Sequence, residues 1–271
     1  MENYSVLMSV YDKENAEYLK LAMKSMFEQT VLTDDFVLVC DGPLTEALNS
    51  VIEEMSQTYG DILNVVRLEV NSGLGNALNE ALMHCKNELV ARMDSDDISM
   101  PKRCEKQLEV FCHNEELAVC SGTIVEFEGA IHQEIGRRCV PKSHEEICRF
   151  SRKRNPFNHP AVMFRKTYVE QVGGYKETYH LFEDYYLWIR MLMKGYKGYN
   201  LQSPLLYMRS TKDMYKRRGG CAYAKDMLRF HKWMKQEGWS SFADYLSGAV
   251  PHGIVCVLPN GIRKIVYKVL R

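Results

Sequence analysis

The sequence has no apolar stretch of the roughly 18–20 residues that a membrane-spanning helix needs. It also has no Cys-x-x-Cys pair, and its 9 cysteines are an odd number without regular spacing. This pattern favours reduced thiols over a disulfide framework or a zinc site. No basic segment followed by an apolar stretch opens the chain, so we expect no secretory signal and a cytoplasmic protein.

An excess of either charge is also missing, because 35 Lys and Arg balance 35 Asp and Glu. The distribution is nevertheless uneven: residues 1–135 hold 9 basic and 25 acidic residues (−16), and residues 136–271 hold 26 and 10 (+16). Two solvated faces would give this polarity, and so would a second half that faces phosphates or a membrane surface. No recognition motif accompanies the basic charge, so we expect no nucleic-acid partner.

The first hundred residues alternate between short apolar runs and helical patterns. Strands are expected at 4–10, 36–40, 63–70 and 88–93, and helices at 16–27, 43–57 and 74–85. Continuous apolar strands separated by helices predict a parallel sheet with right-handed crossovers. Four polar residues follow these strands: Tyr11, Asp41, Asn71 and Asp94. Because ligands of such sheets lie at the carboxyl ends of the strands, we expect these four along one edge.

The second half is less regular and has no repeat, low-complexity tract or long linker. The patterns predict helices at 101–111, 183–194 and 215–236, a hairpin of 118–127 with 131–140, and strands at 161–164 and 205–209. Ser143 and Glu146 fit a capping box for a short helix. One compact domain with a C-terminal appendage is therefore expected.

An acidic cluster, Asp94-Ser95-Asp96-Asp97, directly follows the fourth expected strand. Three carboxylates so close together repel one another unless a cation is present. A hard divalent ion with oxygen ligands, Mn²⁺ or Mg²⁺ bridging a diphosphate, solves that problem. An acidic loop that caps the following helix would also explain the cluster.

Six segments together resemble glycosyltransferase family 2, whose catalytic domain has the GT-A fold. They are 5–11 with Glu14, 29–30, 37–42, 71–79, 91–97 and 182–185, in the family's order across about residues 4–210. Residues 155–160 and 173–175 are also similar to bacterial capsule and O-antigen transferases. Asp12 and Pro43 depart mildly from the family pattern, where Asn and Ser are common. The resemblance implies an α/β protein of the GT-A (nucleotide-diphospho-sugar transferase) fold: a Rossmann-like, mainly parallel sheet with a helical C-terminal extension.

By this resemblance, Asp94-Ser95-Asp96 looks like the DxD motif. Asp96 would coordinate the Mn²⁺ or Mg²⁺ that bridges the donor's phosphates, and Asp94 would contact the ribose or the metal. Asp97 is expected to support the loop through Arg103 or Lys102. The chemistry agrees, because a leaving nucleoside diphosphate builds negative charge that a metal stabilises.

Five further residues match positions around the donor nucleotide. Asp41 matches the residue that accepts a hydrogen bond from uracil, and Tyr11 and Glu14 match positions that line the base. Gly73 would let the backbone approach the nucleotide, and Asn76 belongs to the same motif. For Tyr11 an ordinary strand-end aromatic, and for Gly73 a plain turn glycine, remain alternatives.

The acceptor side depends on Glu183-Asp184, at the expected start of a helix. The resemblance makes Asp184 the general base that deprotonates the acceptor hydroxyl, and a helix N-terminus favours its charged form. Glu183 would orient the acceptor, although both acids would also complement the helix dipole. His159 would bind sugar hydroxyls or a phosphate, or be structural. Trp188 and Arg190 are expected in the core and in an ion pair.

The C-terminal sequence 261–271 has the pattern of a basic amphipathic helix. Its apolar face comprises Ile262, Ile265, Val266, Val269 and Leu270, and its basic residues are Arg263, Lys264, Lys268 and Arg271. Such a helix would lie on an anionic leaflet, or dock onto its own domain. The basic runs 152–154 and 216–218 would add to this surface or hold a lipid-linked diphosphate.

These observations predict a GT-A catalytic domain over 1–212 and a basic helical extension over 213–271 that associates with a membrane. Within the domain, 1–97 would bind the nucleotide and 98–212 the acceptor. The expected function is inverting transfer of a hexose, from a UDP-sugar to a lipid-linked oligosaccharide, on the inner face of the cell membrane in surface polysaccharide synthesis. A sugar-phosphate nucleotidyltransferase would have a Gly-rich loop after the first strand, unlike 9–14. A non-catalytic sugar- or nucleotide-binding subunit would need no base.

Overall fold

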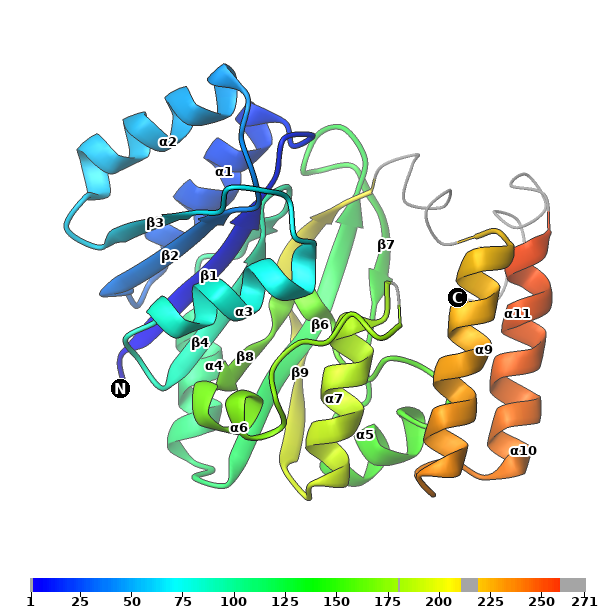
Figure 1. The fold of residues 1–271 in the computed structure, drawn as a ribbon. Helices are drawn as coiled ribbons and strands as arrows, with labels where there is room; N and C mark the ends of the chain where they lie inside the picture. The colour runs from blue at the N-terminus through cyan, green and yellow to red at the C-terminus, as the bar shows by residue number, and fades with distance from the viewer. Residues whose placement is uncertain (1, 180, 211–218, 259–271) are drawn as a thin grey trace.

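The computed structural model describes residues 2–179, 181–210 and 219–258, and in these ranges the strands form one nine-stranded sheet (Figure 1). The strands are β1 (Tyr4–Val10), β2 (Asp35–Cys40), β3 (Leu63–Arg67), β4 (Leu89–Asp94), β5 (Ile98–Ser99), β6 (Leu117–Phe127), β7 (Glu134–Arg138), β8 (Met163–Arg165) and β9 (Lys197–Arg209). Their order is β3-β2-β1-β4-β8-β6-β9-β5, with β7 on β6. Strands β3, β2, β1 and β4 run parallel, and β6 is parallel to β9; β8 is antiparallel to β4 and β6. The predicted α/β architecture is confirmed.

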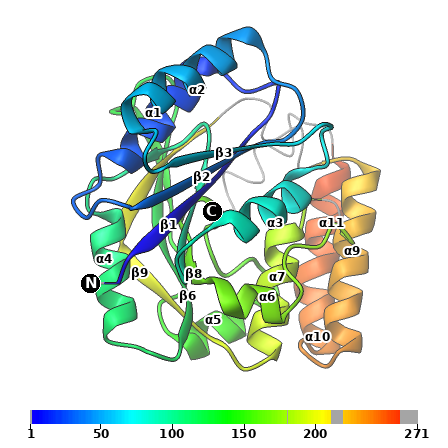
Figure 2. The same cartoon turned by 60° about the vertical axis from the view of Figure 1, so that its left-hand side comes forward.

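Helices cover both faces of this sheet (Figure 2). They are α1 (Ala16–Phe27), α2 (Glu46–Tyr59), α3 (Leu74–His84), α4 (Arg103–Cys112), α5 (His144–Phe150), α6 (Lys166–Gln171) and α7 (Glu183–Met193). Alternate residues of β1 point to opposite faces: Val6 and Met8 pack with α1, α2 and α4, whereas Leu7 packs with α3 and α7. This two-sided burial explains why β1 is apolar at every position except Ser5 and Ser9.

Several element boundaries differ from the expected ones, among them the starts of α2 and β9 and the end of β3. Helix α2 begins at Glu46 rather than Pro43, because the Thr45 hydroxyl accepts a hydrogen bond from Leu48 N–H at 3.4 Å and caps the helix. Strand β3 ends at Arg67 rather than residue 70. Strand β9 begins at Lys197 rather than residue 205, because its whole length pairs with β6. The predicted capping box of α5 is present.

The C-terminal elements are α9 (Cys221–Gln236), α10 (Phe242–Asp244), a π-helical turn η2 (Tyr245–Ala249) and α11 (Val250–Val257). Helices α9 and α11 lie side by side at one edge of the molecule (Figures 1 and 2). Helix α9 packs on α7 through aromatic rings, with Phe230 and Tyr185 4.8 Å apart between ring centroids. No helix of the described residues is long and apolar enough to cross a membrane. The predicted tail 261–271 and the basic run 216–218 lie outside the described residues.

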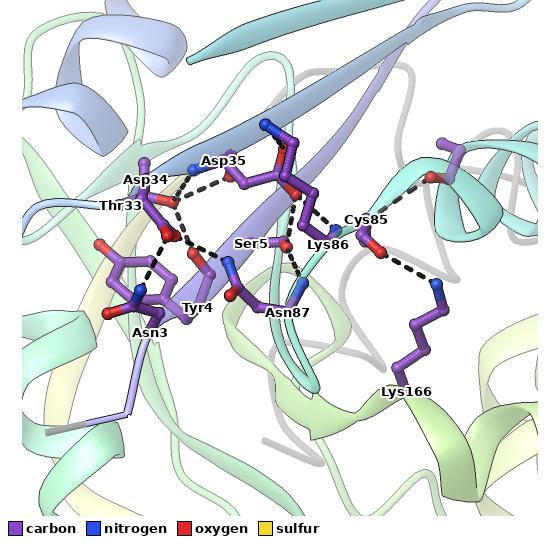
Figure 3. Close-up of polar contacts among 11 residues, drawn as sticks. Asn3, Tyr4, Ser5, Thr33, Asp34, Asp35, Cys85, Lys86, Asn87 and Lys166 are labelled. Carbon is purple, nitrogen blue, oxygen red and sulfur yellow. Dashed lines mark hydrogen bonds and ion pairs between the residues drawn. The ribbon is translucent and has the colours of Figure 1, made fainter.

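A polar network joins the amino ends of β1 and β2 to the turn before β4 (Figure 3). Asp35 is fully buried; its Oδ2 accepts hydrogen bonds from Ser5 Oγ at 2.6 Å and from the Lys86 backbone N–H at 2.8 Å. Ser5 Oγ in turn accepts one from the Asn87 N–H at 3.0 Å. This network fixes the end of the sheet opposite to the carboxyl ends of the same strands, where the candidate site lies.

Candidate active site

Pairing of the parallel strands brings three sequence-distant segments to one edge of the sheet. Val10 lies beside Cys40, and Ser9 lies beside Asp94, so Tyr11, Asp41 and the acidic cluster follow neighbouring strand ends. Strand β3 ends earlier than predicted, yet Asn71 reaches the same edge because its Nδ2 donates to the Asp41 carbonyl at 3.2 Å. The predicted grouping of these four positions at one edge is confirmed.

The carboxylate of Asp41 is only 6% exposed and clamps the turn before α3. Its Oδ1 accepts hydrogen bonds from Ser72 N–H at 2.6 Å and Ser72 Oγ at 3.2 Å, and its Oδ2 accepts one from Gly73 N–H at 3.2 Å. Both oxygens are thus already used within the chain, although a carboxylate has lone pairs for further donors.

Gly73 has φ +89°, and a side chain there would meet a residue from the second half of the chain. A Cβ would lie 2.3 Å from Glu177 Oε1, at the end of a flexible side chain that would have to move, and the positive φ itself favours glycine. Asn76 is exposed, and its Nδ2 donates to the Ser72 carbonyl at 2.9 Å. It also lines a shallow hollow together with Glu69 and Glu80, whose charges do not suit a phosphate.

Glu14 ties the loop after β1 to the acidic cluster. Its Oε2 accepts a hydrogen bond from Ser95 Oγ at 2.9 Å, and its Oε1 accepts one from the Asn15 N–H at 2.8 Å. Tyr11, at the start of this loop, is half-buried, and its carbonyl accepts from the Glu14 N–H at 3.1 Å. The loop that carries Tyr11 is therefore held directly against the DxD segment.

The acidic cluster has the geometry of a cation site. Asp94, Asp96 and Asp97 each offer one carboxylate oxygen, and these oxygens lie within 4.8 Å of one another. Asp97 is 1% exposed, and its Oδ2 has no hydrogen-bond partner among the described residues. Burial, and then the charges of Asp96 and Asp94, raise the pKa of Asp97 well above its ordinary value. An unsatisfied buried oxygen among three carboxylates fits a hard divalent ion.

The expected partners of Asp97 were wrong. Its Oδ1 accepts a hydrogen bond from the backbone N–H of Arg209 at 2.8 Å, not from Arg103 or Lys102. Arg103 is buried beneath β4 and donates to the Arg92 carbonyl at 2.6 Å. Arg209, at the end of β9, also donates its Nε hydrogen to the Asp96 carbonyl at 3.0 Å, so this strand holds the DxD loop.

Arg92 is a site residue that the sequence analysis missed. It is 1% exposed on β4, it forms an ion pair with Asp94, and its Nε and Nη1 have no hydrogen-bond partner within the described residues. Burial opposes its charge, but Asp94, Tyr175 and Asp184 outweigh burial, so the pKa of Arg92 is raised. An arginine inside an otherwise apolar strand was the available clue, because buried cations need a carboxylate partner.

Asp184 lies in the first turn of α7, as predicted. Its Oδ1 accepts from the Tyr185 N–H at 2.7 Å, and its Oδ2 accepts from Asn155 Nδ2 at 2.7 Å. Glu183 Oε1 accepts from the backbone N–H of Leu181 at 3.0 Å. Leu181 has φ 64°, a left-handed conformation that costs a non-glycine residue energy. The entry to α7 is thus fixed by both acids.

His159 begins the short 3-10 helix η1 (His159–Ala161), and its Nε2 is 2.9 Å from Tyr175 Oη. Burial, and then the charge of Arg92, lower the pKa of His159 well below its ordinary value, so the imidazole is neutral. A neutral ring does not supply charge to a phosphate but can still hydrogen-bond a sugar. Trp188 is fully buried, as expected. Arg190 forms no ion pair in the described part of the chain; it donates to the Gly174 carbonyl at 2.6 Å.

A mainly parallel, Rossmann-like sheet with an acidic cluster at the carboxyl ends of its strands is the architecture of the GT-A fold. The sequence matches the family model described as glycosyl transferase family 2 over residues 5–173. The chain therefore belongs to glycosyltransferase family 2. It is 37% identical over 265 residues to the UDP-Gal:alpha-D-GlcNAc-diphosphoundecaprenol beta-1,3-galactosyltransferase of Escherichia coli, covering 98% of this chain and 95% of that one.

Two other proteins are also similar. The amylovoran biosynthesis glycosyltransferase AmsE of Erwinia amylovora is 38% identical over 240 residues, 87% of this chain and 88% of that one. Among solved structures, the mannosyltransferase PcManGT from Pyrobaculum calidifontis, in complex with GDP-Man and Mn²⁺, aligns with a TM-score of 0.67 at 15% identity. That alignment covers 99% of this chain and 80% of the other, and it supports the GT-A fold.

Proposed function

We propose that this glycosyltransferase is metal-dependent and inverting, and that it transfers a hexose from a UDP-sugar to a lipid-linked glycan in cell-surface polysaccharide synthesis. The observation that carries the proposal is the acidic cluster at the carboxyl end of β4, where oxygens of Asp94, Asp96 and Asp97 lie within 4.8 Å of one another and Asp94 pairs with the buried Arg92. Asp184, in the first turn of α7, would supply the carboxylate for the acceptor hydroxyl. The galactosyltransferase relative, whose name specifies UDP-Gal and a diphosphoundecaprenol acceptor, supports the choice of substrates.

On the donor side, Asp96 and Asp94 would hold Mn²⁺ or Mg²⁺, and the buried free oxygen of Asp97 fits this assignment. The ion would supply positive charge to the diphosphate leaving group. Arg92 neutralises part of the charge of Asp94, which lets three acids stay close together. Tyr11, Glu14, Asp41, Gly73 and Asn76 would line the nucleotide. We assign this donor role to residues 1–97.

On the acceptor side, Asp184 would take the proton of the attacking hydroxyl, with residues 98–212 forming the acceptor site. Asn155 and the Tyr185 N–H hold its two oxygens, so the carboxylate is oriented before the acceptor arrives. Attack on the anomeric carbon from the face opposite to the diphosphate would invert its configuration. Glu183 and the neutral His159 would contact the acceptor sugar.

The acceptor's lipid would place the enzyme at the inner face of the cell membrane, with residues 213–271 as the membrane-associating part. This assignment rests on the basic and apolar sequence of 261–271.

The test is a transfer assay with a panel of UDP- and GDP-hexoses, a synthetic acceptor with a short lipid on a sugar diphosphate, and Mn²⁺. A UDP-hexose should support transfer, and the product should have the anomeric configuration opposite to that of the donor, measured by NMR coupling constants. Retention of configuration, or transfer from GDP-hexoses alone, would contradict the proposal.

A further inference from the structure

The outer surface of the α9–α11 pair carries an unusual concentration of apolar side chains. Helix α11 contains no Asp, Glu, Lys or Arg, yet it lies at the edge of the molecule (Figure 1). Ile254 and Val257 on its outer side are 59% and 53% exposed. A helix that is apolar all round normally lies in a protein core or in lipid. Helix α11 packs against the rest of the protein on one side only.

The preceding turns extend the apolar surface. Phe242 of α10 is 61% exposed, and Leu246 of η2 is 48% exposed. With Ile254 and Val257, this makes four large apolar residues that are exposed in the segment 242–257. Contiguous exposed apolar residues of this kind mark interaction surfaces, whereas single ones are ordinary.

Helix α9 supplies a row of basic residues beside this apolar surface. Lys225, Arg229 and Lys232 follow one another at helical spacing, and with Leu228 and Val257 they line a groove of about 370 Å³ between α9 and α11. The rim of the groove is thus basic, and its floor is mainly apolar.

The charge of this row is available to a partner. Arg229 pairs with Asp226 at 2.7 Å, but neither Lys225 nor Lys232 has a carboxylate partner within the described ranges. Lys235, one turn further on, lies with its Nζ 5.4 Å from the ring centroid of Phe242. Basic and apolar side chains are therefore interleaved on one surface.

We infer that this surface, formed by Lys225, Lys232, Lys235, Phe242, Leu246, Ile254 and Val257, docks on an anionic phospholipid bilayer. Its basic row complements the lipid phosphates, and its apolar residues have the size and exposure to enter the acyl boundary, while the lysines keep their ammonium groups at the headgroups. The inference rests on the proposed function, because a lipid-linked acceptor gives the enzyme a reason to bind a membrane. It assigns the membrane contact to the helices α9–α11 rather than to residues 261–271 alone.

The surface connects to the acceptor side of the site through the basic run 152–154. Lys153 Nζ lies 3.4 Å from Asp244 Oδ1, and a Cβ on Gly248 would lie 3.1 Å from the Lys153 Cβ. The next residues lead to Asn155, which holds Asp184. A bilayer against α9–α11 would therefore bring lipid phosphates close to the segment that positions the proposed base.

Co-sedimentation of the full-length protein with vesicles tests the inference. Binding should occur with vesicles of phosphatidylcholine and phosphatidylglycerol, and weaken strongly with phosphatidylcholine alone. Each lysine near such a surface contributes about fivefold to partitioning, so Lys225→Glu with Lys232→Glu should lower binding by at least ~25-fold. Ile254→Asp with Val257→Asp should lower it comparably.

Matched controls exist because the chain exposes similar residues elsewhere. Leu32, before β2, and Met83, in α3, are 70% and 64% exposed and belong to neither α9 nor α11, so Leu32→Asp with Met83→Asp should leave vesicle binding unchanged. Lys102→Glu with Lys194→Glu is the corresponding charge control. Thermal melting of every variant should match the wild type, since all these positions are exposed.

Three results would overturn the inference. The α9–α11 variants bind vesicles as well as the wild type does; removal of 259–271 abolishes binding although the α9–α11 surface is intact; or light scattering shows that the surface mediates a dimer and no vesicle binding occurs. Because sedimentation needs no turnover, it is independent of the proposed reaction. Transfer to a soluble acceptor, measured on the same variants, should stay at the wild-type rate.

Discussion

Asn155 Nδ2 donates a hydrogen bond to Asp184 Oδ2 at 2.7 Å, across 29 residues of sequence. This contact joins the segment that follows the basic run 152–154 to the first turn of α7. Since the Tyr185 N–H holds the other carboxylate oxygen at 2.7 Å, Asp184 has a fixed orientation without any ligand. A general base needs such an orientation, because proton transfer depends on hydrogen-bond geometry.

Replacing Asp184 by Asn should remove transfer and leave the donor bound. Losing a general base costs ~10²–10⁴-fold in rate, whereas the donor would be held by the acidic cluster and Asp41. Asn155→Ala should lower the rate about tenfold, since it removes one hydrogen bond to a charged group. Calorimetric donor affinity and radiolabelled transfer should be measured on the same preparations. A parallel loss of affinity and rate would place Asp184 in the nucleotide site instead.

Asp96→Asn should abolish the effect of Mn²⁺ on donor binding and reduce transfer by orders of magnitude. Asp94, Asp96 and Asp97 have carboxylate oxygens within 4.8 Å of one another, so the loss of one charge weakens the cation site directly. Excess EDTA should inactivate the wild-type enzyme in the same way, and added Mn²⁺ should restore it. Full turnover in EDTA would show that the cluster has another purpose.

The stability of the metal-free protein should fall as the pH rises above the ordinary pKa of an aspartate. The pKa of buried Asp97 is raised in the folded state. Between the ordinary pKa of an aspartate and this raised pKa, the folded state holds a proton that the unfolded state has lost, so the free energy of unfolding falls as the pH rises. Mn²⁺ should therefore raise Tm more at pH 7 than at pH 5. Melting curves in EDTA and in Mn²⁺ measure this. Asp97→Asn should make Tm in EDTA depend less on pH. An unchanged dependence of Tm on pH would show that other groups cause it.

Gly73→Ala should destabilise the protein more than Gly195→Ala does. Both glycines have positive φ, +89° and +88°, so both substitutions strain the backbone by about 1–3 kcal/mol, and Gly73, with ψ 156°, lies in a region that is essentially restricted to glycine. Only at Gly73 would the new Cβ also clash, 2.3 Å from Glu177 Oε1, because nothing lies within 4 Å at Gly195. Urea unfolding gives the free energies. Adding Glu177→Ala to Gly73→Ala should reduce the difference by the part that the clash causes; no change on adding Glu177→Ala would mean that Glu177 simply moves aside.

Asp35→Ala should lower the free energy of unfolding by about 3 kcal/mol, because it leaves buried donors without an acceptor. Asp35 is fully buried and accepts from Ser5 Oγ and the Lys86 N–H (Figure 3). Its neighbour Asp34 also accepts two hydrogen bonds, from Asn3 and Asn87, but these are exposed. Asp34→Ala is thus a matched control and should cost under ~1 kcal/mol. Similar losses for both variants would show that burial does not decide the cost.

The parallel half of the fold could be predicted from the sequence because its determinants are local. Continuous apolar runs such as Val6–Met8 within β1 are required when both faces of a strand are covered, and helix caps depend on residues three positions apart, as in Ser143 and Glu146. The acidic cluster was equally visible, since Asp94, Asp96 and Asp97 adjoin one another. Their position at the sheet edge followed from the strand that precedes them.

What surrounds those acids was decided by tertiary structure. Arg209 donates to Asp97 from 112 residues away, whereas Arg103 or Lys102, both nearer in the chain, was the predicted partner. Arg92 became part of the site because β4 lies between β1 and β8 in the sheet and contacts the short helix η1 (His159–Ala161), which makes its charge a buried one that needs Asp94. Sequence patterns report which faces of an element are buried. Pairing between distant strands depends on the order of the whole sheet. This pairing determines which charged groups are buried next to one another, and therefore which of them shift one another's pKa.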